Sequence, residues 1–267
     1  MPRPSLTSAS PLTVVILTRN EAKRLPTCLA AIPDGYPVLV LDSGSDDDTL
    51  AVATAAGCVV ASNPWPGFAA QRNFALDRCG IASPWVLFVD ADEIYPAAFF
   101  NWFEREGHRR DDFDVAQVTS ILVFAGRPLR HAPGYPIHHP RLVRRGAARF
   151  VPSPSGHGET VGAGTRMIAV DIPYDHHFFD GDISVWMRKH VGLAMQEAFP
   201  RDPGGGHVSA RTRLQGMVPG LLRVLARFAY HYGLRGGFRD GRAGLEYAAM
   251  YAWFEATKLV IRLNGRR

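Results

Sequence analysis

The first ninety residues alternate short apolar runs with segments in which apolar residues recur at helical spacing. The predicted strands cover residues 14–18, 38–42, 58–62 and 85–90. The predicted helices between them cover residues 21–32, 49–56 and 68–79. Strands that alternate with helices in this order predict a mainly parallel sheet with helices on both faces. Ligands of such sheets bind beyond the carboxyl ends of the strands.

The turn after the first strand excludes two common nucleotide-binding folds. It reads Thr18-Arg19-Asn20-Glu21 and contains no glycine. A dinucleotide-binding Rossmann turn needs glycines there so that its backbone can approach the pyrophosphate. A P-loop needs a Gly-Lys-Ser or Gly-Lys-Thr ending, which is also missing.

Acidic residues follow the second strand. Asp42-Ser43-Gly44-Ser45 comes first, and Asp46–Asp48 then precede the helix at 49–56. Three adjacent carboxylates resemble a metal site, but carboxylates in this position also cap a helix and complement its dipole. We therefore interpret Asp46–Asp48 as capping residues.

A second acidic group follows the fourth strand. The apolar run Val86–Val89 leads into Asp90, Asp92 and Glu93. Burial of this strand brings the carboxylates to one point on the rim of the sheet, where they repel one another unless a cation compensates them. Hard oxygen ligands that leave coordination positions for phosphate oxygens describe a Mg²⁺ or Mn²⁺ diphosphate site. We therefore predict Asp90 and Asp92 as metal ligands.

Composition narrows the class of protein. The 267 residues are 46% hydrophobic and 21% charged, which excludes a disordered or fibrous protein. Cys28, Cys58 and Cys79 fit neither a zinc-ligand spacing nor a disulfide framework, so a reducing compartment is expected. No uninterrupted apolar run reaches the roughly 18 residues that span a bilayer, and the short run at 14–17 is no signal-peptide core. We expect a cytoplasmic protein that is neither secreted nor embedded in a membrane.

The positive charge lies near the end of the sequence. Residues 1–200 hold 18 Lys and Arg against 21 Asp and Glu, whereas residues 201–267 hold 12 against 4. Apolar and aromatic residues recur at helical spacing between 214 and 264, which predicts a basic amphipathic helical tail over 201–267. Either this tail binds an anionic membrane surface on the cytoplasmic face, or its apolar stripe packs on the main domain. No nucleic-acid motif accompanies the charge, so no nucleic-acid partner is expected.

Four ordered motifs carry a family resemblance. They are Val14–Glu21, Val40–Thr49, Gln71–Asn73 and Phe88–Glu93. Together they resemble glycosyltransferase family 2, the inverting enzymes of the nucleotide-binding GT-A fold. The resemblance implies a GT-A catalytic domain over residues 1–200, with a nucleotide-binding half near 12–95 and an acceptor half near 96–200, followed by the tail. It also implies sugar transfer from a nucleotide-sugar, with a UDP-linked hexose as the expected donor, to a cell-envelope glycan or lipid-linked acceptor.

Later segments resemble a subgroup that includes lipopolysaccharide core glucosyltransferases. They are Tyr135–Pro136, Pro140–Gly146, His157–Glu159, Asp175–His177 with Lys189, and Gly237–Gly241 with Gly244–Leu245. In that subgroup His and Glu are adjacent, whereas here Gly158 separates His157 from Glu159.

The resemblance implies nucleotide-binding roles for Thr18, Asn20, Glu21, Asp42, Ser43, Arg72 and Asp90. Asp42 would accept a hydrogen bond from the imino N–H of the base, and Arg72 would approach the diphosphate. Asp92, assisted by Asp90, would hold the metal ion that stabilises the charge on the departing phosphate. Helix capping is the alternative role for Asn20 and Glu21, and a solvated loop is the alternative for Asp42.

A direct displacement needs one carboxylate base on the acceptor side. Glu159 is the first choice because it lies in a Gly- and Ser-rich loop beside His157, and Asp175 is the second. Arg141, His157 and His176 are expected at the acceptor or the diphosphate. A solvated basic loop is the alternative for Arg141 and for the Arg144-Arg145 pair.

Three other functions fit parts of the pattern. Phe88–Asp92 also resembles the nucleophile motif of haloacid-dehalogenase-type phosphatases, but that motif normally lies on the first strand and here three strands precede it. A nucleotidyltransferase would share the fold and the metal, yet such enzymes usually have a Gly-rich first loop with Arg or Lys. A non-catalytic protein that binds a nucleotide-sugar is the third alternative, and it stays open at this point.

Overall fold

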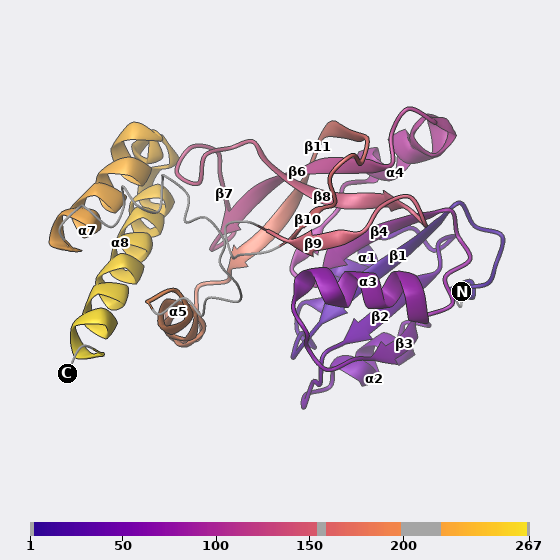
Figure 1. The fold of residues 1–267 in the computed structure, drawn as a ribbon, viewed down its shortest axis with the longest axis horizontal. Coiled ribbons are helices and arrows are strands. Elements are labelled where there is room, and N and C mark those ends of the chain that lie inside the picture. The colour runs from indigo at the N-terminus through magenta and orange to yellow at the C-terminus, as the bar shows by residue number, and fades with distance from the viewer. Residues whose placement is uncertain (1–2, 154–158, 199–219, 266–267) are drawn as a thin grey trace. The chain divides into compact units, whose positions relative to one another are not determined.

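The structure is a computed structural model that describes residues 3–153, 159–198 and 220–265 (Figure 1). The chain forms two compact units. Unit 1 contains Met1–Ser120 and Ile137–His176, and unit 2 contains Ile121–Pro136 and His177–Arg267. The domain boundary predicted at residue 200 lies outside the described residues, as does His157.

The first half of the chain has the predicted alternation of strands and helices. The elements are β1 (Leu12–Thr18), α1 (Leu25–Ala30), β2 (Val38–Asp42), α2 (Thr49–Ala55), β3 (Val59–Ser62), α3 (Phe68–Arg78) and β4 (Trp85–Asp90). Next come β5 (Glu93–Ile94), α4 (Ala97–Arg105) and the 3₁₀ turn η1 (Gly107–Arg109). The later strands are β6 (Val115–Phe124), β7 (Arg127–Leu129), β8 (Ile137–Arg144), β9 (Phe150–Pro152), β10 (Glu159–Val161) and β11 (Met167–Phe179).

The central sheet is mixed. Its strand order is β3-β2-β1-β4-β8-β6-β11-β5, with β7 paired to β6. Strands β3, β2, β1 and β4 are mutually parallel, as the alternation predicts. Strand β8 then pairs antiparallel with both β4 and β6. The strands after α4 follow one another without the crossover helices that parallel pairing requires, so the second half of the sheet is antiparallel.

Strand β4 is apolar from Trp85 to Val89 because both of its faces are covered. Leu87 and Val89 pack in one core cluster with Phe99 of α4. Val86 and Phe88 pack in a second cluster with residues of α3 and β9. This two-sided burial explains the continuous apolar run and fixes the end of the strand, at Asp90, on the rim of the sheet.

Helix α1 begins four residues later than the sequence predicts. Asn20 has a φ of 59°, a left-handed conformation that asparagine tolerates better than most residues. Its N–H donates to Ser45 Oγ at 2.8 Å, and its Oδ1 accepts the Asp46 N–H at 2.9 Å. The segment after β1 is therefore a loop held to the loop after β2, and helix capping by Asn20 is not its role here.

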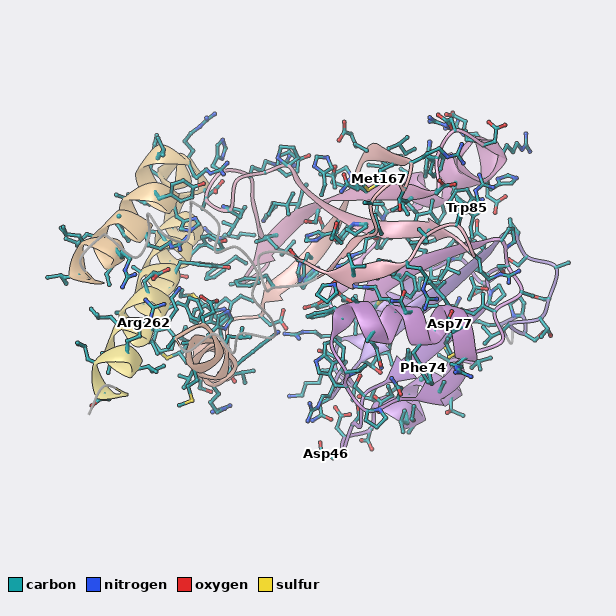
Figure 2. All side chains as sticks on the ribbon, viewed as in Figure 1. Asp46, Phe74, Asp77, Trp85, Met167 and Arg262 are labelled. Atoms are coloured by element: carbon teal, nitrogen blue, oxygen red, sulfur yellow. The ribbon has the colours of Figure 1, made fainter. Side chains whose placement is uncertain are left out.

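The acidic run after β2 behaves as a capping segment. Asp47 Oδ1 accepts the N–H of Thr49, the first residue of α2, at 2.9 Å. Asp46 lies at the outer end of this loop (Figure 2), and Asp46, Asp47 and Asp48 are all exposed to solvent. Asp47 thus contacts the start of α2, as the capping interpretation expects, whereas the N-cap residue Asp48 makes no side-chain capping hydrogen bond.

Unit 2 is mainly helical. Its helices are α5 (Ile183–Ala198), α7 (Gly220–Ala229), the π-helical turn η2 (Tyr230–Leu234), the 3₁₀ turn η3 (Gly237–Asp240) and α8 (Gly241–Asn264). Helices α7 and α8 run side by side (Figure 1). Tyr247 and Phe254 of α8 are buried, so these aromatic residues of the predicted tail face a core. None of the described helices is long and apolar enough to cross a membrane.

Asp240 fixes a loop of unit 2. Its carboxylate accepts the backbone N–H groups of Arg130, His131 and Ala132 at 3.1, 3.0 and 2.7 Å. The His131 ring lies 2.9 Å from the same carboxylate. A Cβ on the nearby Gly244 would lie 2.0 Å from a backbone oxygen of η3, so only glycine fits there. The motif around Asp240 therefore holds this corner together.

Candidate active site

The carboxyl ends of three parallel strands meet at one edge of unit 1. Thr18 of β1 is in register with Asp42 of β2, and Leu17 is in register with Asp90 of β4. Thr18 Oγ1 donates to Asp42 Oδ1 at 3.0 Å. The residues that the sequence places after strands therefore lie together, as the ligand sites of such sheets do.

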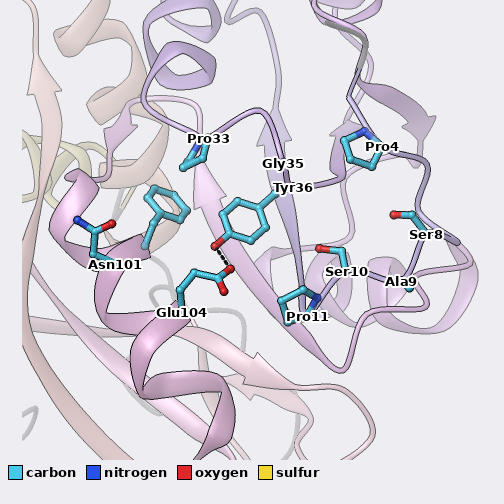
Figure 3. Close-up of a pocket in the computed structure, with 11 residues that line it drawn as sticks. Pro4, Ser8, Ala9, Ser10, Pro11, Pro33, Gly35, Tyr36, Asn101 and Glu104 are labelled. Carbon is cyan, nitrogen blue, oxygen red and sulfur yellow. Dashed lines mark hydrogen bonds between the residues drawn. The ribbon is translucent and has the colours of Figure 1, made fainter.

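A cavity lies at the opposite edge. It has a volume of about 470 Å³ and is lined by Pro11 and Tyr36, which come just before β1 and β2 (Figure 3). Inside it the Tyr36 hydroxyl donates a hydrogen bond to Glu104 Oε1. Because this cavity borders the amino ends of the strands, it is separate from the edge that carries Thr18, Asp42 and Asp90.

Asp42 is surrounded by donors from its own chain. Its Oδ1 accepts from Thr18 Oγ1 and, at 2.5 Å, from Ser45 Oγ, while its Oδ2 accepts the N–H groups of Gly44 and Ser45, both at 2.8 Å. Burial alone would raise the pKa of Asp42, but these hydrogen bonds outweigh it and hold the pKa below its usual range. Four accepted bonds fill the lone pairs of a carboxylate. The imino contact predicted for Asp42 therefore requires one of these bonds to break, and the solvated-loop alternative does not fit a side chain this buried.

The motif Gln71–Asn73 on α3 has three separate partners. Gln71 Nε2 donates to Ser43 Oγ at 3.1 Å, which ties the helix to the loop after β2. Asn73 exchanges hydrogen bonds with both backbone groups of Phe150 in β9. Arg72 points to the end of β4. One turn of helix thus connects the nucleotide half to the acceptor half.

Two buried arginines, Arg72 and Arg141, meet at the end of β4, and we call them the arginine pair. Arg72 Nη2 lies 3.2 Å from Asp90 Oδ1, and Arg141 Nη2 lies 2.9 Å from Asp90 Oδ2. Both also donate to Glu159 Oε1, from Arg72 Nε at 2.9 Å and from Arg141 Nη1 at 3.2 Å. The solvated-loop alternative for Arg141 is thus excluded, because its side chain is only 4% exposed.

The arginine guanidinium groups stabilise the ionised form of the Asp90 carboxylate. Burial alone would raise the pKa of Asp90, but the Arg141 and Arg72 guanidinium groups outweigh it and hold that pKa far below its usual range. Asp90 is therefore ionised at neutral pH. Arg72 Nη1 is buried and has no hydrogen-bond partner among the described residues. That N–H group has the capacity to bind an anionic oxygen that enters the site.

Glu93 completes the cluster, although the sequence prediction assigned it no role. Its Oε1 lies 2.5 Å from Arg141 Nη2, and its Oε2 accepts the Asp90 N–H at 3.1 Å. The side chain is fully buried. The sequence feature that could have pointed to Glu93 is its position as the third carboxylate after a buried strand. Nothing in the sequence shows that Arg141 faces it.

His139 lies on β8, two positions before Arg141. The pairing of β6 with β8 skips Arg141, which marks a β-bulge at this point of the strand. Burial, followed by the charge of Arg141, lowers the pKa of His139 to about 3. This imidazole is consequently neutral at physiological pH and contributes a polar but uncharged group near Arg141.

Asp92 lies beside His176. Its Oδ2 is 3.5 Å from His176 Nε2, and the side chains are 20% and 23% exposed. Burial alone would lower the pKa of His176, but the Asp92 carboxylate outweighs it and raises that pKa. A carboxylate oxygen and an imidazole nitrogen thus face each other at the rim of the sheet, next to the arginine pair.

Asp175 points away from this cluster. Strands β5 and β11 pair so that His176 lies opposite Glu93 and Asp175 lies opposite Ile94. Side chains alternate between the two faces of a strand. Because His176 shares a face with Glu93, Asp175 projects from the other face of the sheet, where it is exposed.

Two other predicted basic residues have structural partners. Arg144 stacks on the Trp85 ring, with its guanidinium 4.4 Å from the ring centroid. Arg145 donates to the backbone oxygens of Ser83 and Ala82. Arg144 is the last residue of β8 and Arg145 follows it. Because β8 is antiparallel to β4, its carboxyl end lies at the amino end of β4. They are therefore remote from the arginine pair.

Comparison with known proteins assigns the family. The sequence profile described as Glycosyl transferase family 2 matches residues 13–132. An uncharacterized glycosyltransferase of Mycobacterium tuberculosis is 41% identical over 186 residues, which cover 61% of this chain and 84% of that protein. The chain belongs to glycosyltransferase family 2. The match in M. tuberculosis reaches well beyond the profile, so the family likeness includes part of the acceptor half.

Relatives from Rickettsia are longer. An uncharacterized glycosyltransferase of Rickettsia felis is 37% identical over 127 residues, which cover 46% of this chain and 44% of that protein. The chain thus spans less than half the length of the Rickettsia relatives. Among solved structures, a mannosyltransferase from Pyrobaculum calidifontis in complex with GDP-Man and Mn²⁺ aligns with a TM-score of 0.50 at 15% identity, over 100% of this chain and 90% of that chain. This likeness supports the predicted GT-A fold.

Proposed function

We propose that the protein is an inverting glycosyltransferase that moves a hexose from a nucleoside diphosphate donor to an acceptor hydroxyl. The convergence of the arginine pair with Asp90, Asp92 and Glu159 at the carboxyl edge of the sheet supports this proposal most directly. Such a reaction must stabilise a departing diphosphate and remove one proton from the acceptor. The site holds cationic donors and a carboxylate for these two tasks.

The nucleoside half of the donor is assigned to the loops after β1 and β2. Thr18, Asn20, Ser43 and Ser45 are tied together there by hydrogen bonds, so the loops form a preformed edge. In this proposal Asp42 shapes that edge, and a UDP-linked hexose is the donor. The choice of uridine rests on the resemblance of the motifs.

The diphosphate is assigned to Arg72. Its Nη1 has capacity for an incoming oxygen, and the neighbouring Asp90 holds the guanidinium in place. A guanidinium matches phosphate oxygens in both charge and geometry. Arg72 and Arg141 would then stabilise the charge that develops on the leaving group.

We propose Asp92 and His176, rather than Asp90, as the protein ligands of a metal ion. Both Asp90 oxygens are engaged by the arginine pair, whereas Asp92 Oδ2 and His176 Nε2 face each other at the rim. No group of three acidic, His or Cys side chains among the described residues is arranged to hold a metal alone, so diphosphate oxygens would complete the coordination. A mixed oxygen and nitrogen donor set fits Mn²⁺ better than Mg²⁺, which prefers oxygen ligands. A bound ion would act as a Lewis acid towards the departing phosphate.

Glu159 remains the proposed base, ahead of Asp175. It lies in the cluster, whereas Asp175 lies on the other face of the sheet. The acceptor is proposed to be a cell-envelope glycan, such as a lipopolysaccharide core, or a lipid-linked sugar at the cytoplasmic face of the membrane. This part of the proposal rests on the subgroup resemblance.

One experiment tests the proposal. The full chain is incubated with UDP-glucose and with GDP-mannose, with and without Mn²⁺, and both thermal stabilisation and release of the nucleoside diphosphate are measured. We expect Mn²⁺-dependent stabilisation and slow donor hydrolysis with UDP-glucose. Stabilisation without any hydrolysis would favour the non-catalytic binding protein, and no response to either donor would contradict the proposal.

A further inference from the structure

Helix α7 presents an apolar face to solvent. Its exposed positions recur at helical spacing and are all apolar: Leu221, Leu222, Leu225, Ala226 and Ala229. We call these five residues the outer α7 face. The three leucines are 68%, 53% and 60% exposed, and no residue of α7 is buried.

The other side of α7 is the one that packs. Arg227 Nη2 reaches Glu255 Oε1 of α8 at 2.7 Å, and Gly220 lies against Leu259 of the same helix. The side of the helix that carries Arg227 is therefore turned towards its neighbour, together with the half-buried Val224 and Phe228, and the side that carries the three leucines is turned outward. An ordinary surface helix of a globular protein has the reverse arrangement.

The turn that follows adds large apolar and basic side chains. Leu234 is 81% exposed and Phe238 is 58% exposed. Arg235 and Arg239 lie beside them in the chain and are also exposed. An apolar helix face continued by exposed leucine, phenylalanine and arginine is typical of segments that lie in a membrane interface.

The charge of this region selects an anionic partner. Residues 220–246 contain five arginines and two acidic residues, Asp240 and Glu246, and Glu246 pairs with Arg242. Asp240 is directed into the loop at 130–132 and is only 4% exposed, so it does not offset the exposed arginines. Anionic lipid headgroups attract such a basic surface and bring it to the acyl boundary.

From these observations we propose that the outer α7 face inserts into the headgroup region of an anionic lipid bilayer. Leu221, Leu222 and Leu225 would enter the acyl boundary, and Leu234 and Phe238 would extend the apolar contact. The exposed arginines would bind the lipid phosphates. Arg227 is occupied by Glu255, so the leucines are the outermost groups of α7. The inference does not depend on the proposed reaction.

Vesicle sedimentation of the full chain tests the proposed insertion of the outer α7 face. We expect binding to vesicles that contain phosphatidylglycerol, weaker binding to vesicles of phosphatidylcholine alone, and weaker binding at high salt. The triple variant Leu221→Gln, Leu222→Gln and Leu225→Gln should lose at least about tenfold in partitioning. Because no residue of α7 is buried, circular dichroism and thermal melting of this variant should match wild type.

A matched control carries three exposed apolar exchanges in unit 1: Val59→Gln, Val151→Gln and Met167→Gln (Met167 is labelled in Figure 2). The partitioning of this control variant into the vesicles should equal that of wild type. Wild type that does not bind, or a triple α7 variant that binds as wild type does, overturns the proposal. It is also overturned if the α7 exchanges dissociate a dimer or lower the melting temperature without changing vesicle binding, because the face then covers a second copy or packs within the chain.

Discussion

Arg72 donates a hydrogen bond from Nε to Oε1 of Glu159 at 2.9 Å, and the same guanidinium pairs with Asp90. The carboxylate proposed as the base and the cation proposed to bind the diphosphate are therefore in direct contact. We expect the two functions to be coupled, because an anion bound to Arg72 would weaken the hydrogen bond from Arg72 to Glu159.

Exchange of Glu159 tests the base. Glu159→Gln should lower turnover in UDP-glucose hydrolysis by about a hundredfold or more while the affinity for UDP changes little, since a general base contributes mainly to the transition state. Steady-state kinetics and calorimetric titration with UDP measure the two effects. Asp175→Asn is the matched control and should stay close to wild type, because Asp175 lies on the other face of the sheet. The reverse result would make Asp175 the base.

Exchange of Asp92 tests the metal assignment. Asp92→Asn should raise the Mn²⁺ concentration needed for half-maximal hydrolysis by about tenfold or more, because the variant loses a charged ligand of the ion. Its melting temperature without metal should remain near that of wild type. Asp46→Asn, at the exposed loop after β2, serves as the control carboxylate. An unchanged Mn²⁺ requirement in Asp92→Asn would exclude Asp92 as a ligand.

Exchange of Asp42 distinguishes a structural role of its carboxylate from recognition of the nucleotide base. Loss of its charge weakens four hydrogen bonds, and we expect Asp42→Asn to lower the free energy of unfolding by about 1.5–3 kcal/mol. Affinities for UDP and GDP should fall by similar factors, because the whole loop edge loosens. Urea unfolding and nucleotide titrations check both points. Normal stability combined with a selective loss of UDP binding would restore the imino contact.

The pH dependence of unit 2 should report on Asp240. Burial alone would raise the pKa of Asp240, but the N–H groups and the His131 ring hold it below its usual range. A carboxyl with a lower pKa in the folded state stabilises the fold above its unfolded pKa, near about 3.9, and this contribution is lost as the pH falls through the folded pKa. Asp240→Asn should therefore be less stable than wild type at pH 7, and the difference should shrink below about pH 4. Urea unfolding at several pH values measures it, and a constant difference would contradict the assignment.

The sequence predicted the parallel part of the fold well because that part depends on local pattern. Each of the strands β1, β2 and β4 is a mainly apolar run that ends in Thr or Asp, and a buried parallel strand favours such a run. The start of α1 was predicted too early because the left-handed conformation of Asn20 depends on Ser45, which lies 25 residues away. Contacts over such distances do not show in a local pattern.

The residues proposed for the site can be singled out in the sequence, but their pairings cannot. Arg72 and Arg141 were both singled out, yet no spacing shows that they share Asp90 and Glu159. In the helical tail, the periodicity revealed an apolar stripe but not which side of each helix faces solvent. The aromatic residues of α8 turned inward, and the leucines of α7 turned outward. That choice depends on the neighbouring helix.

The bonds from Asp240 to the loop at 130–132 join positions that are 108 to 110 residues apart in the chain. A stop codon before Asp240 would thus damage a segment encoded far upstream, and the loss would look like a defect of that segment. For the same reason, the C-terminal helices should not be exchangeable as a cassette between relatives. A functional chimaera would have to carry the 130–132 segment and the Asp240 corner from the same parent.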